Sequence, residues 1–153
     1  MIDQIAIVML RLKAKQKIEV VTEGSCMEPI INNGDIVEIS ASDSYKIGDV
    51  VLVLCQGHLK IHRIIEQDEL GFITKGDHSY LSDKRNNSRI LGVATFNRTQ
   101  NHLVCANRRR ACCRAVISKF ASKAYRKHLK SHALIRKVFL GIYETADFML
   151  FYI

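Results

Sequence analysis

Apolar and polar residues follow two different patterns along the chain. Residues 2–17 repeat apolar side chains every three or four positions, which predicts an amphipathic helix, and lysines gather near its end, where positive charge suits the helix dipole. Between residues 18 and 96, short β-branched runs alternate with turns of Gly, Asn and Asp, which predicts a compact, mostly antiparallel β body. We expect its strands at residues 18–21, 36–39, 50–54, 59–65, 71–74 and 90–96.

The pattern changes again after residue 104. Residues 105–153 contain a single glycine and no proline, and their apolar residues recur at helical spacing. Two helices are predicted, over 107–130 and 132–151. The fold class is therefore α+β, with a β body and N-terminal helix in residues 1–104 and a basic helical region in residues 105–153.

Composition places the chain among folded proteins of a reducing compartment. With 153 residues, 48% of them hydrophobic, it is long enough for one domain with a real core. Its five cysteines are odd in number and irregularly spaced, which argues against a disulfide framework. The sequence has no uncharged apolar run long enough for a transmembrane helix, and its first apolar segment is shorter than a usual signal-peptide core. We expect a cytoplasmic protein, with contact at a membrane surface as an alternative.

Charge separates the two regions. Residues 1–105 hold 12 Lys and Arg against 13 Asp and Glu, whereas residues 106–153 hold 11 against 2. The basic region begins with Arg108, Arg109 and Arg110, for which we expect a role in binding substrate. Its open interpretations are a solvated helix face, a dock for an acidic peptide segment and contact with an anionic membrane. Nucleic acid is the least favoured partner, because interleaved aromatics and a reading motif are missing.

A loop-borne cysteine is the main candidate for chemistry. Residues 24–29 read GSCMEP and include Pro29, the only proline of the chain, which stiffens the loop. Cys26 is either a small buried apolar residue or a nucleophile, and its turn-rich setting favours the nucleophile. Met27, beside it, is a candidate substrate contact.

A nucleophilic thiol needs a base and an orienting carboxylate. His62 lies between apolar strand positions and is the best base, since imidazole exchanges protons near neutral pH; the alternative is an ordinary strand histidine. His58, His78 and His102 are weaker candidates. Asp77 and Asp83 are candidate carboxylates, each with a turn-capping alternative.

Four motifs, in this order, resemble the signal peptidase I family. The run GSCMEP, followed by GDIV at 34–37, resembles the family's box in which a nucleophilic serine precedes Met-x-Pro and then Gly-Asp. GDVV at 48–51 resembles its second Gly-Asp turn. IHRI at 61–64 and TKGD at 74–77 resemble the endoplasmic-reticulum and archaeal branch, where histidine replaces the bacterial lysine base.

This resemblance covers about residues 18–96 and implies a signal-peptidase-like fold that hydrolyses peptide bonds. The branch has a catalytic aspartate a few residues after its TKGD motif, which matches Asp83, so that Asp77 becomes a supporting residue. The self-cleaving SOS-response repressors share the fold and use lysine where this chain has His62.

The chain departs from the family in three ways. Cys26 stands in place of serine, which suits a Cys-His-Asp triad. Gly24 stands where bacterial members carry a serine that binds the oxyanion, so the backbone N–H of Cys26, assisted by Ser25, would take that role. The family's transmembrane anchor is missing from the sequence. We therefore expect a peptide or precursor-protein substrate in the cytosol, such as a precursor that loses its leader, with the acidic leader segment on the basic region.

Two other functions stay open at this point. The chain could be a catalytically inactive peptide-binding or regulatory module, or a basic nucleic-acid-binding protein. The soft ligands His102, Cys105, Cys112 and Cys113 resemble a zinc set only weakly, because they lack the usual Cys-x-x-Cys spacing. No metal and no cofactor is therefore expected.

Overall fold

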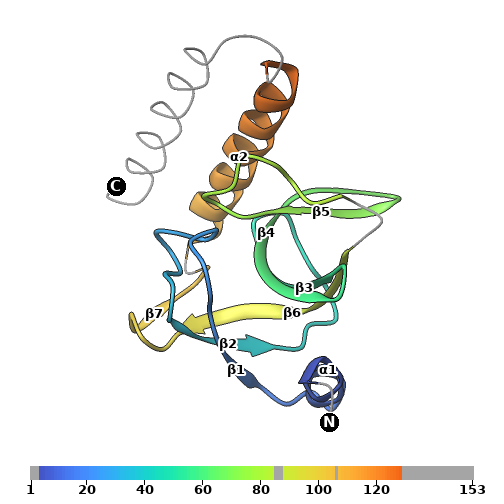
Figure 1. Cartoon of the computed structure of the whole chain (residues 1–153), viewed down its shortest axis with the longest axis vertical. Helices are drawn as coiled ribbons and strands as arrows, with labels where there is room; N and C mark the ends of the chain where they lie inside the picture. The colour runs from blue at the N-terminus through green and yellow to red at the C-terminus, as the bar shows by residue number, and fades with distance from the viewer. Residues whose placement is uncertain (1–3, 85–87, 106, 129–153) are drawn as a thin grey trace.

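The computed structural model describes residues 4–84, 88–105 and 107–128. These residues form two helices and seven strands, arranged as an antiparallel β body with a helix at each end (Figure 1). In chain order they are α1 (Gln4–Lys13), β1 (Ile18–Val21), β2 (Ile36–Ser40), β3 (Val50–Cys55), β4 (His58–Asp68), β5 (Gly71–Lys75), β6 (Ser88–Asn97), β7 (His102–Leu103) and α2 (Arg108–His128).

All seven strands belong to one antiparallel sheet. Six of them run in the order β1-β2-β6-β3-β4-β5, and β7 pairs with β6. Among the described strands, β1 pairs with β2 alone, so it lies at an edge of this sheet. β4 pairs with β3 over residues 58–63 but with β5 only from Arg63 onward, so residues 58–62 present a second open strand edge within the described structure.

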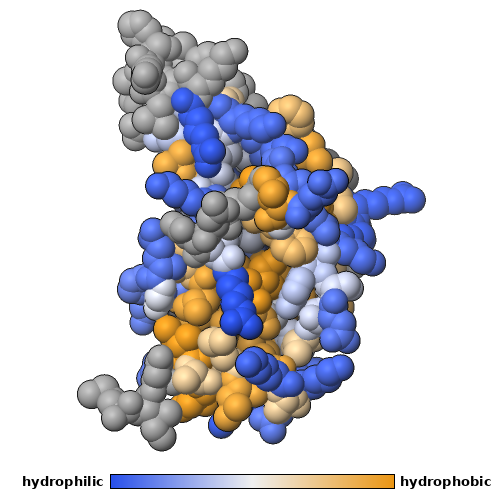
Figure 2. Space-filling view, turned by 90° about the vertical axis from the view of Figure 1, so that its right-hand side faces the viewer, coloured by the Kyte–Doolittle hydropathy of each residue, from blue (hydrophilic) through white to orange (hydrophobic). Residues whose placement is uncertain are grey.

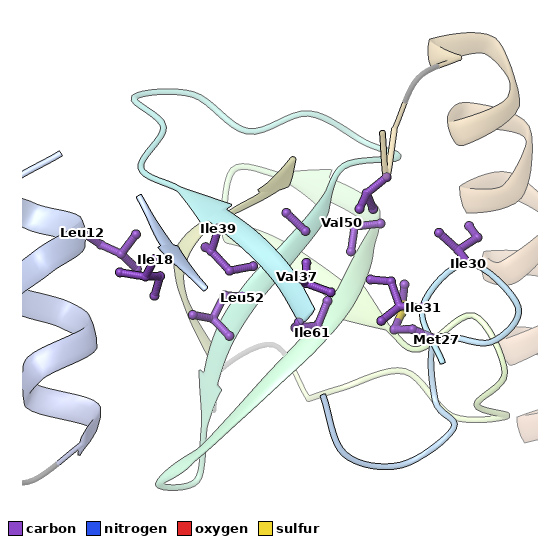
Figure 3. Close-up of a cluster of buried hydrophobic side chains, with 12 residues drawn as sticks. Leu12, Ile18, Met27, Ile30, Ile31, Val37, Ile39, Val50, Leu52 and Ile61 are labelled. Atoms are coloured by element: carbon purple, nitrogen blue, oxygen red, sulfur yellow. The ribbon is translucent and has the colours of Figure 1, made fainter. Parts of the chain in front are cut away.

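The alternation of side chains along the strands builds two apolar clusters on opposite faces of the sheet. Val50, Leu52 and Ile61 belong to the larger cluster, which also holds Met27 and Ile31 of the Cys26 loop (Figure 3). The smaller cluster contains Val51, Val53 and Ile64. Because successive strand side chains point to opposite faces, the side chains of neighbouring β4 residues lie in different surroundings.

The structure confirms the predicted α+β class and the antiparallel β body, and it shifts several element ends. The first helix ends at Lys13 rather than residue 17, because Lys15 takes a positive φ of 57° and Gln16 N–H returns to the Arg11 carbonyl at 3.0 Å. This hydrogen-bond pattern terminates helices. β4 is longer than predicted, and β7 is too short for its pattern to be recognised in the sequence.

The basic region contributes one described helix, α2, close to the predicted 107–130; the second predicted helix, 132–151, lies outside the described residues. α2 packs against β4 and buries Ala111 and Ala115. Gly48 permits this contact, because a Cβ there would lie 2.9 Å from the carbonyl carbon of Ala111. Neither of the described helices is apolar over a length sufficient to span a bilayer.

Candidate active site

The loop between β1 and β2 presents Cys26. Its ends are tied together where Thr22 N–H donates to the Asp35 carbonyl at 2.9 Å and Gly34 N–H donates to the Thr22 carbonyl at 2.8 Å. Met27, adjacent to the cysteine, is only 2% exposed and anchors the loop in the larger apolar cluster. The Cys26 thiol is consequently held half-buried at the surface of the β body rather than in its core.

A second loop, residues 76–84, follows β5 and also contacts Cys26. His78 N–H donates to the Cys26 carbonyl at 2.8 Å. Gly76 lies so close that a Cβ would meet the Cys26 carbonyl oxygen at 2.6 Å and the Ser79 hydroxyl at 2.6 Å. A larger residue at position 76 would therefore push the two loops apart.

The same loop brings Asp83 to His62. The His62 Nδ1 and Asp83 Oδ2 atoms are 2.5 Å apart, and the Thr74 hydroxyl donates to that same carboxylate oxygen at 2.6 Å. Cys26 also interacts with the His62 ring. Asp83 occupies Nδ1 of the ring, and the Cys26 thiol lies 3.9 Å from the carbonyl oxygen of Ile61, the residue before His62, so the structure brings Cys26, His62 and Asp83 together.

The electrostatics of this centre favour charge on His62. Burial alone would lower the pKa of His62, but its hydrogen bonds to Asp83 and Cys26, with their charges, outweigh burial and raise the pKa to about 9. Burial likewise raises the pKa of Asp83, yet the His62 and Thr74 hydrogen bonds lower it below its usual value. An imidazolium–carboxylate pair is the stable form at neutral pH.

Asp77 lies with Arg63, not with His62. The Arg63 guanidinium donates to both Asp77 carboxylate oxygens, at 2.8 and 2.6 Å, and to the Gly48 carbonyl at 2.7 Å. Burial opposes charge on Arg63, but Asp77 outweighs it and raises the pKa of the guanidinium above its usual value. This buried pair connects the β5–β6 loop to the turn on which α2 packs.

A groove of about 1170 Å³ opens onto the triad residues. It is lined by α1, by the open edges of β1 and β4, and by Tyr125 of α2. Figure 2 shows apolar side chains gathered on one face of the molecule, at the end that carries α1 in Figure 1. The apolar lining residues are Ile5, Val8, Val20, Val21, Met27, Ile31, Leu52, Leu59, Ile61, Tyr80, Leu81 and Tyr125.

Of the other predicted site residues Met27, Ser25, Arg108, Arg109 and Arg110, only Met27 lines this groove. Ser25 is exposed, and no described residue accepts a hydrogen bond from its N–H or from that of Cys26. Arg108 forms an ion pair with Asp49 instead of facing the groove. Arg109 and Arg110 are exposed at the start of α2 and are also not among the lining residues.

Two of the three cysteines in the weak zinc set contact backbone carbonyls, and the third, Cys113, is exposed. The Cys105 thiol is 3.7 Å from the Gly48 oxygen and the Cys112 thiol is 3.6 Å from the Ile47 oxygen. Within residues 4–84, 88–105 and 107–128, no three potential metal ligands of the His, Cys, Asp or Glu type converge.

Several residues of the site were missed in the sequence. Thr74 belongs to the TKGD motif, so its position beside Asp83 had a usable signal. Tyr80, Ser122 and Tyr125 had none, because their place depends on where α2 docks.

The chain matches no protein-family model, no curated protein and no solved structure at a significant level, so the geometry of the site is what bears on its chemistry.

Proposed function

We propose that this chain is a cysteine-type endopeptidase with a signal-peptidase-like fold. One observation carries the proposal: His62 is hydrogen-bonded to the Asp83 carboxylate at 2.5 Å while its ring also interacts with Cys26, a half-buried residue that lines the groove. A thiol, an imidazole and a carboxylate in this order are the parts of a triad.

The reaction follows from these positions. The Cys26 thiol gives its proton to the His62 imidazole, the sulfur attacks the carbonyl carbon of the peptide bond, and the carbonyl electron pair moves to its oxygen. The tetrahedral intermediate then collapses, the C–N bond breaks, and His62 gives its proton to the leaving amine, which leaves a thioester on Cys26. Water, deprotonated by His62, attacks the thioester, the C–S bond breaks to release the carboxylic acid product, and His62 returns the proton to the sulfur.

Two backbone groups are available for the oxyanion. The N–H groups of Ser25 and Cys26 have no acceptor among the described residues. An N–H group that donates to nothing in the folded chain can donate to the oxygen of the intermediate at no cost in broken hydrogen bonds. Ser25 is thus a candidate through its backbone, while its side chain is exposed to solvent.

The groove suits an extended peptide. It runs past β1, which pairs on one side only, and past residues 58–62 of β4, which lack a β5 partner. Open strand edges bind peptides through main-chain hydrogen bonds, and apolar walls select side chains. Removal of a leader from a precursor peptide is the specific activity we favour.

The motifs that resemble signal peptidase I each supply one part of this arrangement. Segment 24–29 carries the thiol, 61–64 carries the imidazole and the buried Arg63, and 74–77 carries Thr74 and Asp77. In segment 48–51, the Gly48 carbonyl accepts from Arg63. These contacts give each motif a physical role and support a family-like fold.

The proposal is tested by trapping the acyl intermediate. The protein is incubated with a mixed peptide library, quenched in acid and examined by mass spectrometry for cleaved peptides and a thioester on Cys26. The Cys26→Ala variant should abolish both signals, because the attacking atom is gone, whereas Cys113→Ala, at an exposed cysteine on α2, should retain them. Peptides bound by the wild type but never cleaved would identify a binding module instead. Unchanged cleavage by Cys26→Ala would exclude the triad.

A further inference from the structure

Helix α2 holds the loop that carries Asp83. The Ser82 N–H donates to the Ser122 hydroxyl at 3.3 Å, and the Arg126 guanidinium donates to the Ser82 hydroxyl at 2.6 Å. Arg126 also reaches the Ser82 carbonyl at 3.5 Å. α2 therefore binds the backbone N–H, the carbonyl and the side chain of Ser82, which directly precedes Asp83 in the chain.

An aromatic contact links the same helix to the same loop. The rings of Tyr80 and Tyr125 are stacked, with centroids 5.2 Å apart and planes 16° from parallel. Both tyrosines line the groove together with residues of α1, and Figure 1 shows α2 at the opposite end of the molecule from α1. Tyr125 thus bounds the space available to a substrate while also supporting Tyr80.

The loop transmits this support to the reacting groups. At one end, His78 N–H binds the Cys26 carbonyl; at the other, Asp83 N–H donates to the Thr74 carbonyl at 2.8 Å while its carboxylate binds His62. Ser82 lies between these anchors and is fixed from α2. A shift of Ser82 would change the distance from Asp83 to the imidazole, on which the interaction depends steeply in a partly desolvated site.

We infer that α2 is part of the active site: Ser122 and Arg126 are positioning residues that fix Asp83 through Ser82, and Tyr125 is a specificity-determining residue of the groove. This inference rests on the proposed function. It assigns to the basic region a contribution to catalysis in addition to the substrate recruitment expected from its charge. The Ser122 contact should matter more than the Arg126 contact, because Ser122 is 3% exposed whereas Arg126 is solvent-exposed and its interaction is screened.

The positioning role is tested by NMR titration of the His62 ring in the whole chain, which needs no substrate. The charged and titratable neighbours of His62 are Cys26, Asp83 and, through Asp83, Lys60, whose Nζ lies 3.9 Å from Asp83 Oδ1. In the Ser122→Ala/Arg126→Ala variant, a looser Asp83 should lower the His62 pKa from about 9 by roughly half a pH unit or more. Lys123→Ala, exposed on the same helix, is the matched control and should leave it unchanged.

Two further variants separate positioning from general destabilisation. Ser122→Thr, which keeps the hydroxyl, should restore the wild-type titration, while a merely structural contact would change the melting temperature and not the pKa. Tyr125→Leu should leave the titration intact but alter KM about tenfold between peptides that differ in one large apolar residue, with kcat nearly constant. An unchanged titration in the double variant and unchanged peptide preference in Tyr125→Leu would overturn the inference.

These results are distinguishable from failure of the proposed function. Iodoacetamide alkylation of Cys26 is compared between the wild type and His62→Gln. If the two rates are equal, the triad itself is excluded and the inference is overturned with it. If alkylation depends on His62 but the α2 variants have no effect on its titration, only the inference is overturned.

Discussion

Two neighbouring residues of β4 form two ion pairs with different consequences. His62 and Arg63 point to opposite faces of the strand, and each binds an aspartate from the loop that follows β5. Arg63 and Asp77 have side-chain exposures of 1% and 3%, and three of the guanidinium's bonds go to Asp77 and Gly48. His62, in contrast, has one ring nitrogen 2.5 Å from the Asp83 carboxylate, and its ring also interacts with Cys26, which lines the groove.

The difference shows why only one pair is suited to chemistry. A guanidinium keeps its proton at any physiological pH, so the Arg63–Asp77 pair can stabilise the fold but cannot transfer a proton. An imidazole exchanges its proton at accessible pH, and the groove gives it a reacting partner. One loop therefore carries the aspartate of the buried Arg63 pair and, six residues later, the aspartate that contacts His62.

The sharpest test of this comparison is loss of the functional carboxylate. Asp83→Asn should lower kcat by about 10⁴-fold, as in the best-studied serine triad, because the amide cannot stabilise the imidazolium. The measurement is single-turnover cleavage of a peptide identified from the library. A loss of less than tenfold would show that Asp83 does not orient His62.

The counterpart substitution should affect folding instead. Asp77→Asn leaves the Arg63 charge buried without its carboxylate, and breaking a buried pair in this way costs roughly 3–5 kcal/mol. We expect a large decrease in the denaturant midpoint, with kcat per folded molecule reduced far less than in Asp83→Asn. Equal stability with a lost rate would reverse the roles of the two aspartates.

The pH dependence of stability should also separate the pairs. The His62 pKa is about 9 in the folded chain, above its ordinary value of 6.5, so the stabilisation from its charge is complete below about pH 6.5 and is lost as the pH rises through about 9. Melting temperatures of the wild type should therefore fall by several degrees between these limits, and those of His62→Gln should fall less. His58→Gln, at an exposed residue of the same strand, should behave as the wild type does.

The smallest effect is expected outside both pairs, at the start of α2. Neutralising Arg108, Arg109 and Arg110 to glutamine should raise KM for an acidic peptide a few-fold, with kcat unchanged, because these residues lie away from the groove and act through screened charge. Added salt should reduce the difference from the wild type. A loss of kcat at saturating peptide, with an unchanged melting temperature, would place them in the active site.

Local patterns in the sequence determined the strands, the turn-borne thiol and the alternation that separates His62 from Arg63. These features depend on side-chain periodicity and turn residues within a few positions, which a single sequence displays directly. The motif spacing also pointed to Asp83 over Asp77 through a resemblance, although both are loop aspartates of similar local context. The end of α1 was less readable, since a lysine in a left-handed conformation has no strong sequence signal.

The tertiary structure alone decided how α2 enters the site. The α2 residues that contact the loop lie about forty positions after it in the chain; they are Ser122, Tyr125 and Arg126. Their helical spacing does not predict this contact. The groove likewise arises only when α1, two open strand edges and the two loops come together. Contacts between distant segments depend on strand order and helix docking. The same local pattern is compatible with several strand orders and helix positions, so it does not predict those contacts.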